Sequence, residues 1–355
     1  MDFITFALSY NIQFNSIEMP SEIFKVDTES GTPKYKQLIN SLLQSIDMGQ
    51  LSVGDRLPSI NSICKEFGLS RDTVLVAFNE LKVRGVISSV PGKGYYLAST
   101  STQFKKNVFL LFEEFNVFKE ILYNSFIENL NDKAIVDIYF HHFNRSVFKE
   151  LIESNNGKYT SYVIMPAKFN DAYSVLKDLP QNQVYILDQT NSTLKRHYPA
   201  VYQNFEKDVF TALESGVDLL KKYKKIYFVY PGGKEPLGQL KGFKIFASQY
   251  QEQWRMLVID SLKERKICSG EVYIVPNDND LVTLVKEAKK EQLEIGSELG
   301  IISYNDTPLK EVVADGITTI STDFKEMGKI LADLVLNSKN NLIENKSRLI
   351  RRSSL

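Results

Sequence analysis

The stretch that decides the fold of this 355-residue chain runs from residue 54 to residue 97 and reads GDRLPSINSICKEFGLSRDTVLVAFNELKVRGVISSVPGKGYYL. Ser59 is suited to cap a short helix. The apolar residues of that helix recur at the i, i+3, i+4 and i+7 spacing of one buried face, at Ile60, Ile63, Cys64 and Phe67. Gly68 permits a sharp reversal, and Ser70 can cap a second helix with Asp72 in its first turn. The pattern therefore predicts two short helices joined by a tight turn.

The second of these helices leaves its N-terminal end polar. Val74, Phe78 and Leu81 bury one side of it, while Arg71 and Thr73 stay at the open end. In helix-turn-helix proteins, residues at this end of the second helix reach base edges in the major groove of DNA. We therefore predict a DNA interface that includes Arg71, Thr73 and the two capping serines, Ser59 and Ser70.

A predicted β-hairpin follows the second helix, which we expect to end at Gly85. Two short β-prone stretches, Val86–Ser89 and Gly94–Leu97, flank a turn that contains Gly92, Lys93 and Gly94. One cation between two glycines is suited to close approach to a phosphate backbone or a minor groove. Helices and hairpin together predict an α+β winged helix-turn-helix domain, to which Arg56 adds a further basic contact.

Four blocks extend this pattern over residues 25–98. They read Pro33-Lys34-Tyr35-x-Gln37-Leu38-Ile39, Gly49-x-Leu51-x-x-Gly54-Asp55-Arg56-Leu57-Pro58-Ser59, Leu69-Ser70-Arg71-Asp72-Thr73-Val74 and Gly92-Lys93-Gly94-Tyr95. With these blocks in order, the segment resembles the DNA-binding domain of the GntR family of bacterial transcription regulators. The alternative is a helical bundle with a hairpin that contacts proteins. Basic residues at three separate motif positions, Arg56, Arg71 and Lys93, favour DNA.

The charge balance shows how such a domain would bind. The whole chain has a formal net charge of +0, and residues 25–98 contain nine Lys or Arg against seven Asp or Glu. No broad basic field attracts nucleic acid, so affinity must come from a few positioned contacts and from dimerisation.

Length and composition set the domain organisation. A soluble-type composition, 43% hydrophobic and 24% charged, over 355 residues predicts two or three domains. We expect a flexible N-terminal extension at 1–24, the winged domain at 25–98, a linker at 99–107 and a two-lobed ligand-sensing and dimerisation domain at 108–355. Because residues 1–20 lack the charged start of a signal peptide and no apolar run is long enough to span a membrane, we expect a cytoplasmic protein with no membrane partner.

Short apolar runs alternate with helical segments beyond residue 107. Runs this apolar indicate strands buried on both faces, as in parallel sheets covered by helices. Their number exceeds one comfortable sheet, so we predict two α/β lobes. The segment 253–275 is short for a full helix–strand unit. The predicted strands are Val108–Phe112, Ile135–Tyr139, Tyr162–Met165, Val184–Leu187, Ile226–Tyr230, Trp254–Ile259, Val272–Val275, Ile301–Ser303 and Ile317–Ile320.

Several blocks relate this region to a known domain. The main ones are Leu299–Asp306, Gly316–Ile320 and Met327-Gly328, supported by Tyr185–Asp188, Gly242-Phe243, Pro276–Asp278 and Arg348–Ser353. Residues 107–352 thus resemble the effector domain of lac-repressor-type regulators, an α/β two-lobed domain of the type I periplasmic-binding-protein kind. The resemblance implies a homodimer on an inverted-repeat operator, with a small effector, most often a sugar, between the lobes.

Ligands of such folds lie outside the carboxyl ends of the strands. The resemblance places ligand contacts at Asp188, Asp278 and Asn305. Phe112, Glu113 and Glu114 are included because they also end a strand on that side. The resemblance also points to Gln239, at a position where the family often has Arg. At the position of Asn305 the family often has Asp. Both departures remove charge and argue against a strongly anionic ligand. The alternative is that these strand-end residues cap helices or turns.

Enzymatic interpretations are weak. The segment 231–236, Pro-Gly-Gly-Lys-Glu-Pro, fails the spacing of a phosphate-binding loop, and 277–280 lacks the Gly and Glu of a calcium loop. His141, His142 and His197 have no partners at metal-ligand spacing. We predict no catalytic residues, cofactor or metal. The alternatives are a sugar-binding module without transcriptional output and a DNA-binding domain fused to an enzyme-like domain.

Overall fold

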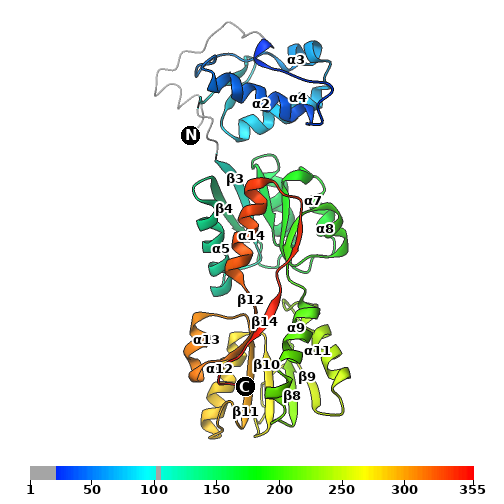
Figure 1. Ribbon diagram of the computed structural model, residues 1–355, viewed down its shortest axis with the longest axis vertical. Helices are drawn as coiled ribbons and strands as arrows, with labels where there is room; N and C mark the ends of the chain where they lie inside the picture. Colours follow the sequence, from blue (N-terminus) through cyan, green and yellow to red (C-terminus); the bar gives the residue numbers. More distant parts are fainter. Residues whose placement is uncertain (1–20, 101–104) are drawn as a thin grey trace. The chain divides into compact units, whose positions relative to one another are not determined.

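The computed structural model describes residues 21–100 and 105–355 (Figure 1). It divides into two compact units, one made of residues up to 109 with 132–137 and 153–162, and one made of the remaining residues. Most of the expected N-terminal extension lies outside the described residues, as do residues 101–104 of the expected linker. Of the expected extension, Ile23 and Phe24 are described. Both are buried in the core of the first domain, where their apolar side chains pack with those of its helices. A strand already begins at Lys106, inside the expected linker.

The first domain has the predicted helix-turn-helix with a hairpin. Its elements are η1 (Ser21–Ile23), α2 (Lys34–Asp47), α3 (Ile60–Phe67), α4 (Arg71–Val83), β1 (Ile87–Val90) and β2 (Gly94–Leu97).

Both predicted helix caps are confirmed. The Ser59 side chain accepts a hydrogen bond from the backbone N–H of Ser62 at 3.1 Å, and Ser70 accepts one from Thr73 at 3.2 Å. Gly68 ends α3 in a left-handed conformation (φ 63°) that favours glycine. These local bonds fix where each helix begins, so the turn between α3 and α4 is set by the sequence.

A single apolar core joins the three helices to the hairpin. Leu38, Ile63 and Phe78 are fully buried, one from each helix. Phe78 also packs edge-on against Tyr95 of β2, with ring centroids 4.8 Å apart. The hairpin is thus held to the helices by aromatic packing.

The predicted two α/β lobes are confirmed, and the described residues of this region form two six-stranded sheets. Their orders are β13-β7-β6-β5-β3-β4 and β14-β12-β11-β10-β8-β9. In the second sheet, β9, β8, β10, β11 and β12 pair in parallel and β14 pairs antiparallel to β12. The strands are β3 (Lys106–Phe112), β4 (Ala134–Phe140), β5 (Ser161–Ile164), β6 (Val184–Asp188), β7 (Ala200–Tyr202), β8 (Lys225–Val229), β9 (Arg255–Ile259), β10 (Glu271–Val275), β11 (Leu299–Tyr304), β12 (Thr318–Thr322), β13 (Leu342–Glu344) and β14 (Ser347–Ile350).

Helices connect these strands and cover the sheets (Figure 1). Since β13 returns to the first sheet and β14 to the second, the chain passes between the sheets three times: after β7, after β12 and after β13. The helices are α5 (Val117–Leu130), α6 (Arg145–Asn155), α7 (Ala172–Leu176), η2 (Gln181–Gln183), α8 (Ser192–His197), α9 (Phe205–Ser215), α10 (Val217–Leu220), α11 (Leu237–Gln249), α12 (Asp278–Lys290), α13 (Pro308–Val312), η3 (Val313–Asp315) and α14 (Phe324–Asn337).

The short segment between β9 and β10 contains no helix. Its Leu262 and Ile267 are buried against the second sheet in place of a helical face. Arg265 holds it there: its guanidinium lies 3.9 Å from the ring centroid of Tyr227, and its Nε donates to the Tyr273 hydroxyl at 2.7 Å. Buried Glu271 accepts from Tyr273 at 2.7 Å, which completes the cluster. Stacking and hydrogen bonds thus replace the missing helix.

Two motif glycines have a steric reason. A Cβ on Gly328 of α14 would lie 2.8 Å from the backbone N of Phe126 and 2.9 Å from Cβ of Ser125, both in α5. A Cβ on Gly242 of α11 would collide with the carbonyl oxygen of Glu206 in α9. Each helix pair therefore approaches so closely that only glycine fits.

Gly328→Ala should destabilise the protein by about 1–3 kcal/mol, because the added methyl forces α5 and α14 apart. The measurement is urea unfolding followed by circular dichroism. Lys329→Ala, on the exposed side of the same helix, is the control and should change the unfolding free energy by less than about 0.5 kcal/mol. Equal stability of Gly328→Ala and the wild type would show that the helices can separate freely.

Candidate functional site

The predicted DNA-contact residues lie at two places in the first domain. Arg71 opens α4 and is exposed, and its Nη1 donates to Oδ1 of Asn61 in α3 at 2.7 Å. Ser70 and Thr73 share a hydrogen bond of 2.8 Å between their hydroxyls at the same helix end. Asn61 was not predicted from the sequence. The sequence feature that could have identified it is an amide side chain on the exposed side of α3, from which Asn61 holds the Arg71 side chain in place.

The second place is the hairpin. Lys93 is exposed at its tip between Gly92 (φ 72°) and Gly94 (φ 108°), which take conformations that favour glycine. The backbone of Arg56 forms an isolated antiparallel β-bridge with Tyr96. Its side chain lies beside Gly94, where an added Cβ would be 3.6 Å from Arg56 Nε. The sequence thus places one cation on the hairpin tip and a second one behind it.

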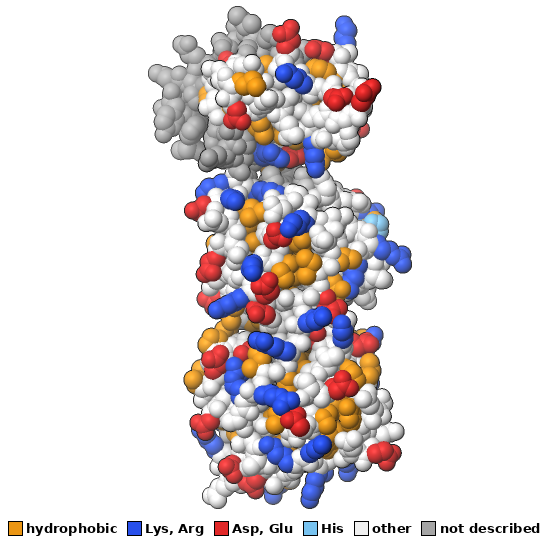
Figure 2. Space-filling model, in the orientation of Figure 1, with side chains coloured by type: hydrophobic (Ala, Val, Ile, Leu, Met, Phe, Trp, Pro, Cys, Tyr) orange, Lys and Arg blue, Asp and Glu red, His pale blue; other side chains and the backbone are white. Residues whose placement is uncertain are grey.

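The surface drawn in Figure 2 carries Lys and Arg interspersed with Asp and Glu. This agrees with the formal net charge of +0. On this face, attraction of a polyanion has to rely on individual cations, since mixed charges give no large field.

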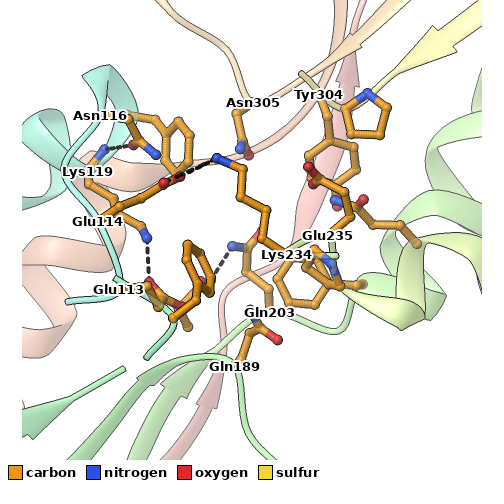
Figure 3. Close-up of a pocket in the computed structure, with 17 residues that line it drawn as sticks. Glu113, Glu114, Asn116, Lys119, Gln189, Gln203, Lys234, Glu235, Tyr304 and Asn305 are labelled. Atoms are coloured by element: carbon orange, nitrogen blue, oxygen red, sulfur yellow. Dashed lines mark hydrogen bonds and ion pairs between the residues drawn. The ribbon is translucent and has the colours of Figure 1, made fainter. Parts of the chain in front are cut away.

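A polar pocket of about 530 Å³, which includes space open to solvent, lies where strands of both six-stranded sheets end (Figure 3). It is lined by Glu113, Glu114, Asn116, Phe118, Lys119, Phe143, Asp188, Gln189, Gln203, Phe205, Lys234, Glu235, Pro236, Gln239, Pro276, Tyr304 and Asn305. Five of the seven residues expected to contact a ligand are brought together here: Glu113, Glu114, Asp188, Gln239 and Asn305.

Two expected ligand residues are not in the pocket. Phe112 has 0% of its surface exposed and packs against Phe140, since the last residue of β3 still points into the apolar layer and only the next residue reaches the strand end. Asp278 begins α12, and its side chain is 65% exposed and paired with Lys310 Nζ at 2.8 Å. The structure does not bring these two residues to this pocket, and ligand contact by them stays a prediction.

Glu113 forms a buried ion pair with Lys119 of α5. Glu113 is 1% exposed and Lys119 is 5% exposed, and the Lys119 ammonium donates to Glu113 Oε2. A buried carboxylate without such a partner would be strongly destabilising. Lys119 is therefore the partner of the buried Glu113 carboxylate, and both residues line the pocket.

Asp188 ends β6 in a left-handed conformation with φ 70°. Nε2 of Gln203 donates to its Oδ1 at 2.5 Å, and Asp188 makes no ion pair in the described part of the chain. Burial, and then the nearby Glu113 charge, raise the pKa of Asp188 to about 6, although Lys119 and Gln203 act in the opposite direction. The pocket thus holds a carboxylate whose charge is only partly compensated.

Across the pocket lie polar atoms that lack partners. Gln239 is 3% exposed and Asn305 follows β11 with φ 61°; Oε1 of Gln239 and Oδ1 of Asn305 accept no hydrogen bond from the described residues. Beneath Asn305, Nζ of buried Lys310 donates to the backbone oxygens of Tyr304 and Asn305, each at 2.8 Å. Buried acceptors without donors are rare in folded proteins, and both residues line the pocket.

The loop 231–236 forms the remaining wall. Lys234 reaches across the pocket, and its Nζ lies 2.8 Å from Oε1 and 3.2 Å from Oε2 of Glu114 (Figure 3). The Lys168 ammonium donates to the backbone oxygen of Gly233 in the same loop. Burial raises the pKa of Glu235 next to it. The segment set aside as a failed phosphate loop is therefore part of the site.

Three important pocket residues were not predicted from the sequence. Lys119 and Tyr304 look like ordinary helix and strand residues, and only the fold brings them to the pocket. Gln203 follows β7, a strand of three residues that was too short to recognise. The sequence feature that could have identified Gln203 is its amide side chain directly after the apolar stretch Ala200–Tyr202.

Asp188→Asn should stabilise the ligand-free protein by about 1–2 kcal/mol at neutral pH. Because the folded-state pKa is raised, Asp188 favours the folded protein only when protonated, and this contribution is lost as the pH rises through 6. The difference between variant and wild type should vanish below about pH 4. Urea unfolding over this pH range measures it. The control is Asp260→Asn, at an exposed position after β9. An Asp188→Asn variant that is less stable at neutral pH would show that the carboxylate serves as a structural cap.

Comparisons with known proteins agree with this architecture. Residues 34–97 match the gntR family of bacterial regulatory proteins, and residues 247–355 match the periplasmic binding protein-like domain. The chain is 34% identical over 70 residues to the arabinose metabolism transcriptional repressor of Geobacillus stearothermophilus, which is 20% of this chain. It spans 19% of the length of that relative and 16% of the length of the regulators YdfD and YcxD of Bacillus subtilis.

Two solved structures resemble the second region. A LacI family transcriptional regulator from Arthrobacter, in complex with lactose, is 14% identical with a TM-score of 0.57, over 70% of this chain and 99% of that one. A LacI family regulator from Enterococcus faecium with bound ribose is 18% identical with a TM-score of 0.55, over 70% and 98%. In the described residues, no helix is long and apolar enough to cross a membrane. The chain thus joins a winged domain that matches the gntR family of bacterial regulatory proteins to a domain that matches the periplasmic binding protein-like domain and has the fold of the LacI family structures.

Proposed function

We propose that this chain is a cytoplasmic transcription regulator, a repressor, whose binding to operator DNA is controlled by a small ligand in the Asp188 pocket. The observation that carries the proposal is the pairing of a gntR-type winged domain with a pocket that contains unsatisfied buried acceptors. Similar proteins point to the class of effector. The relative from Geobacillus is named as an arabinose metabolism repressor, and the two LacI-type structures contain lactose and ribose. We propose a hydroxylated, sugar-sized ligand.

The ligand contacts we propose are Glu113, Glu114, Asp188, Gln239 and Asn305. Carboxylate and amide oxygens accept hydrogen bonds from hydroxyl groups, and Phe118, Phe143 and Phe205 offer apolar surface for a ring. The lining contains no serine, cysteine or histidine that could act as an activated nucleophile or a base beside one. The polar and aromatic lining supports the binding of a hydroxylated ligand.

Control of DNA binding then follows from a shift of population. A ligand that contacts residues after strands of both sheets favours the arrangement in which those strand ends are close. We propose that the chain acts as a homodimer on an inverted repeat, because helix-turn-helix proteins read two half-sites at a fixed spacing. Ligand binding would alter that spacing and release the operator, with a coupling of about 1–3 kcal/mol.

Arg71→Ala should weaken binding to the operator by about 1–3 kcal/mol and binding to unrelated duplex far less, because the residue is placed to read a base. Fluorescence anisotropy with both duplexes measures this. Lys82→Ala, at an exposed position near the other end of α4, is the matched control for loss of one positive charge. If both duplexes lose the same affinity, Arg71 contacts only phosphate. A double-mutant cycle with Asn61→Ala should show coupling, since Asn61 holds the guanidinium.

Lys93→Ala should weaken binding to all duplexes alike and reduce the slope of log K against log salt by about one unit, since one phosphate contact is lost. The measurement is a salt titration of anisotropy with operator and unrelated DNA. An unchanged slope would mean that the hairpin tip does not reach the duplex.

A further inference from the structure

The charges that line the pocket do not balance. Four carboxylates, Glu113, Glu114, Asp188 and Glu235, stand against two ammonium groups, those of Lys119 and Lys234, which leaves two negative charges in excess. No arginine is among the lining residues. A phosphorylated or carboxylated ligand would bring further negative charge into a site whose two ammonium groups are both paired with carboxylates.

The two lysines are already engaged. Lys119 is paired with Glu113, and Lys234 with Glu114. Neither Asp188 nor Glu235 forms an ion pair within the described chain. Of the two, Asp188 is the better placed to receive a cation. Among the described residues, Gln203 is the only side chain that donates to it, and burial and the Glu113 charge raise its pKa to about 6.

Independent acceptors point the same way. Gln239 and Asn305 both line the pocket, and Gln239 is 3% exposed. Oε1 of Gln239 and Oδ1 of Asn305 are buried and accept no hydrogen bond from the described residues. An acceptor-rich wall needs a ligand that donates many hydrogen bonds. An ammonium group donates three and accepts none, whereas a hydroxyl donates one.

One of the two lysines that line the pocket comes from its loop wall. Lys234 extends from the loop 231–236 and its ammonium rests between the two oxygens of Glu114 (Figure 3). This lysine is half exposed, so the pair contributes little to stability. It does show that an ammonium group can enter the pocket and be received there by carboxylates.

We infer that the effector is a hydroxylated amine, such as an amino sugar, whose ammonium group binds at Asp188 while its hydroxyl groups contact the polar side that Gln239 and Asn305 contribute to the pocket. The inference rests on the proposed function only in taking this pocket as the effector site. A neutral sugar can satisfy the acceptors but leaves the two excess negative charges in place. A ligand with one ammonium group satisfies the acceptors and also compensates one of the two excess charges, and this separates the two ligand classes.

The test is isothermal titration calorimetry of the full chain at neutral pH with glucosamine, galactosamine and mannosamine. Each is compared with its parent hexose and with its N-acetyl derivative, which keeps the ring and removes the charge. At least one amine should bind about tenfold or more tightly than both neutral counterparts, the scale of one charged hydrogen bond. The 6-phosphates of the same sugars should bind more weakly than the parents.

Asp188→Asn should reduce the preference for the amine to less than about threefold, while Asp260→Asn, the same change at an exposed strand end, should keep it. Thermal unfolding of both variants verifies that they are folded. Equal or tighter binding of a neutral sugar, tightest binding of a phosphate, or no binding of any amine would overturn the inference. Because this titration contains no DNA, a failure to regulate an operator would refute the proposed function without affecting the result.

Discussion

The incompletely compensated charge of Asp188 is the physical constraint on which the ligand pocket depends. Burying a carboxylate is costly unless partners offset the lost hydration. The chain supplies such a partner to Glu113 through Lys119 and to Glu114 through Lys234, yet gives Asp188 only the amide of Gln203. The left-handed backbone at Asp188 and Asn305 adds local strain at the same site. Ligand-free, the pocket is therefore less stable than it could be, and a ligand that donates to these groups recovers that free energy.

This arrangement links the pocket to the rest of the chain. The ligand contacts we propose lie at the ends of strands of both sheets: Glu113 and Asp188 in the first sheet, Asn305 in the second. The chain passes three times between those sheets, so any change in their separation must be absorbed by three connections at once. Two discrete arrangements, rather than a continuous range, are the expected result for packed elements of this kind. That is the property a ligand-controlled regulator requires.

Much of this could be read from the sequence, and the reasons are local. The caps Ser59 and Ser70, the glycine turn at Gly68 and the hairpin depend on residues a few positions apart, so the sequence determines them directly. The apolar strands also stood out. Long-range features were not predicted, because Lys119 and Gln203 meet their partners only in the folded chain. Asp278 pairs with Lys310, a residue 32 positions away whose burial no local pattern reveals, and does not line the pocket.

The most direct test of the account is whether the pocket and the DNA interface are thermodynamically linked. It requires calorimetric titration of the tightest-binding pocket ligand into the free protein and into its complex with an operator selected from random duplexes. The account predicts about 5- to 150-fold weaker ligand binding to the complex, matched by an equal loss of operator affinity when the ligand is saturating. Identical ligand affinity in the two titrations would contradict it.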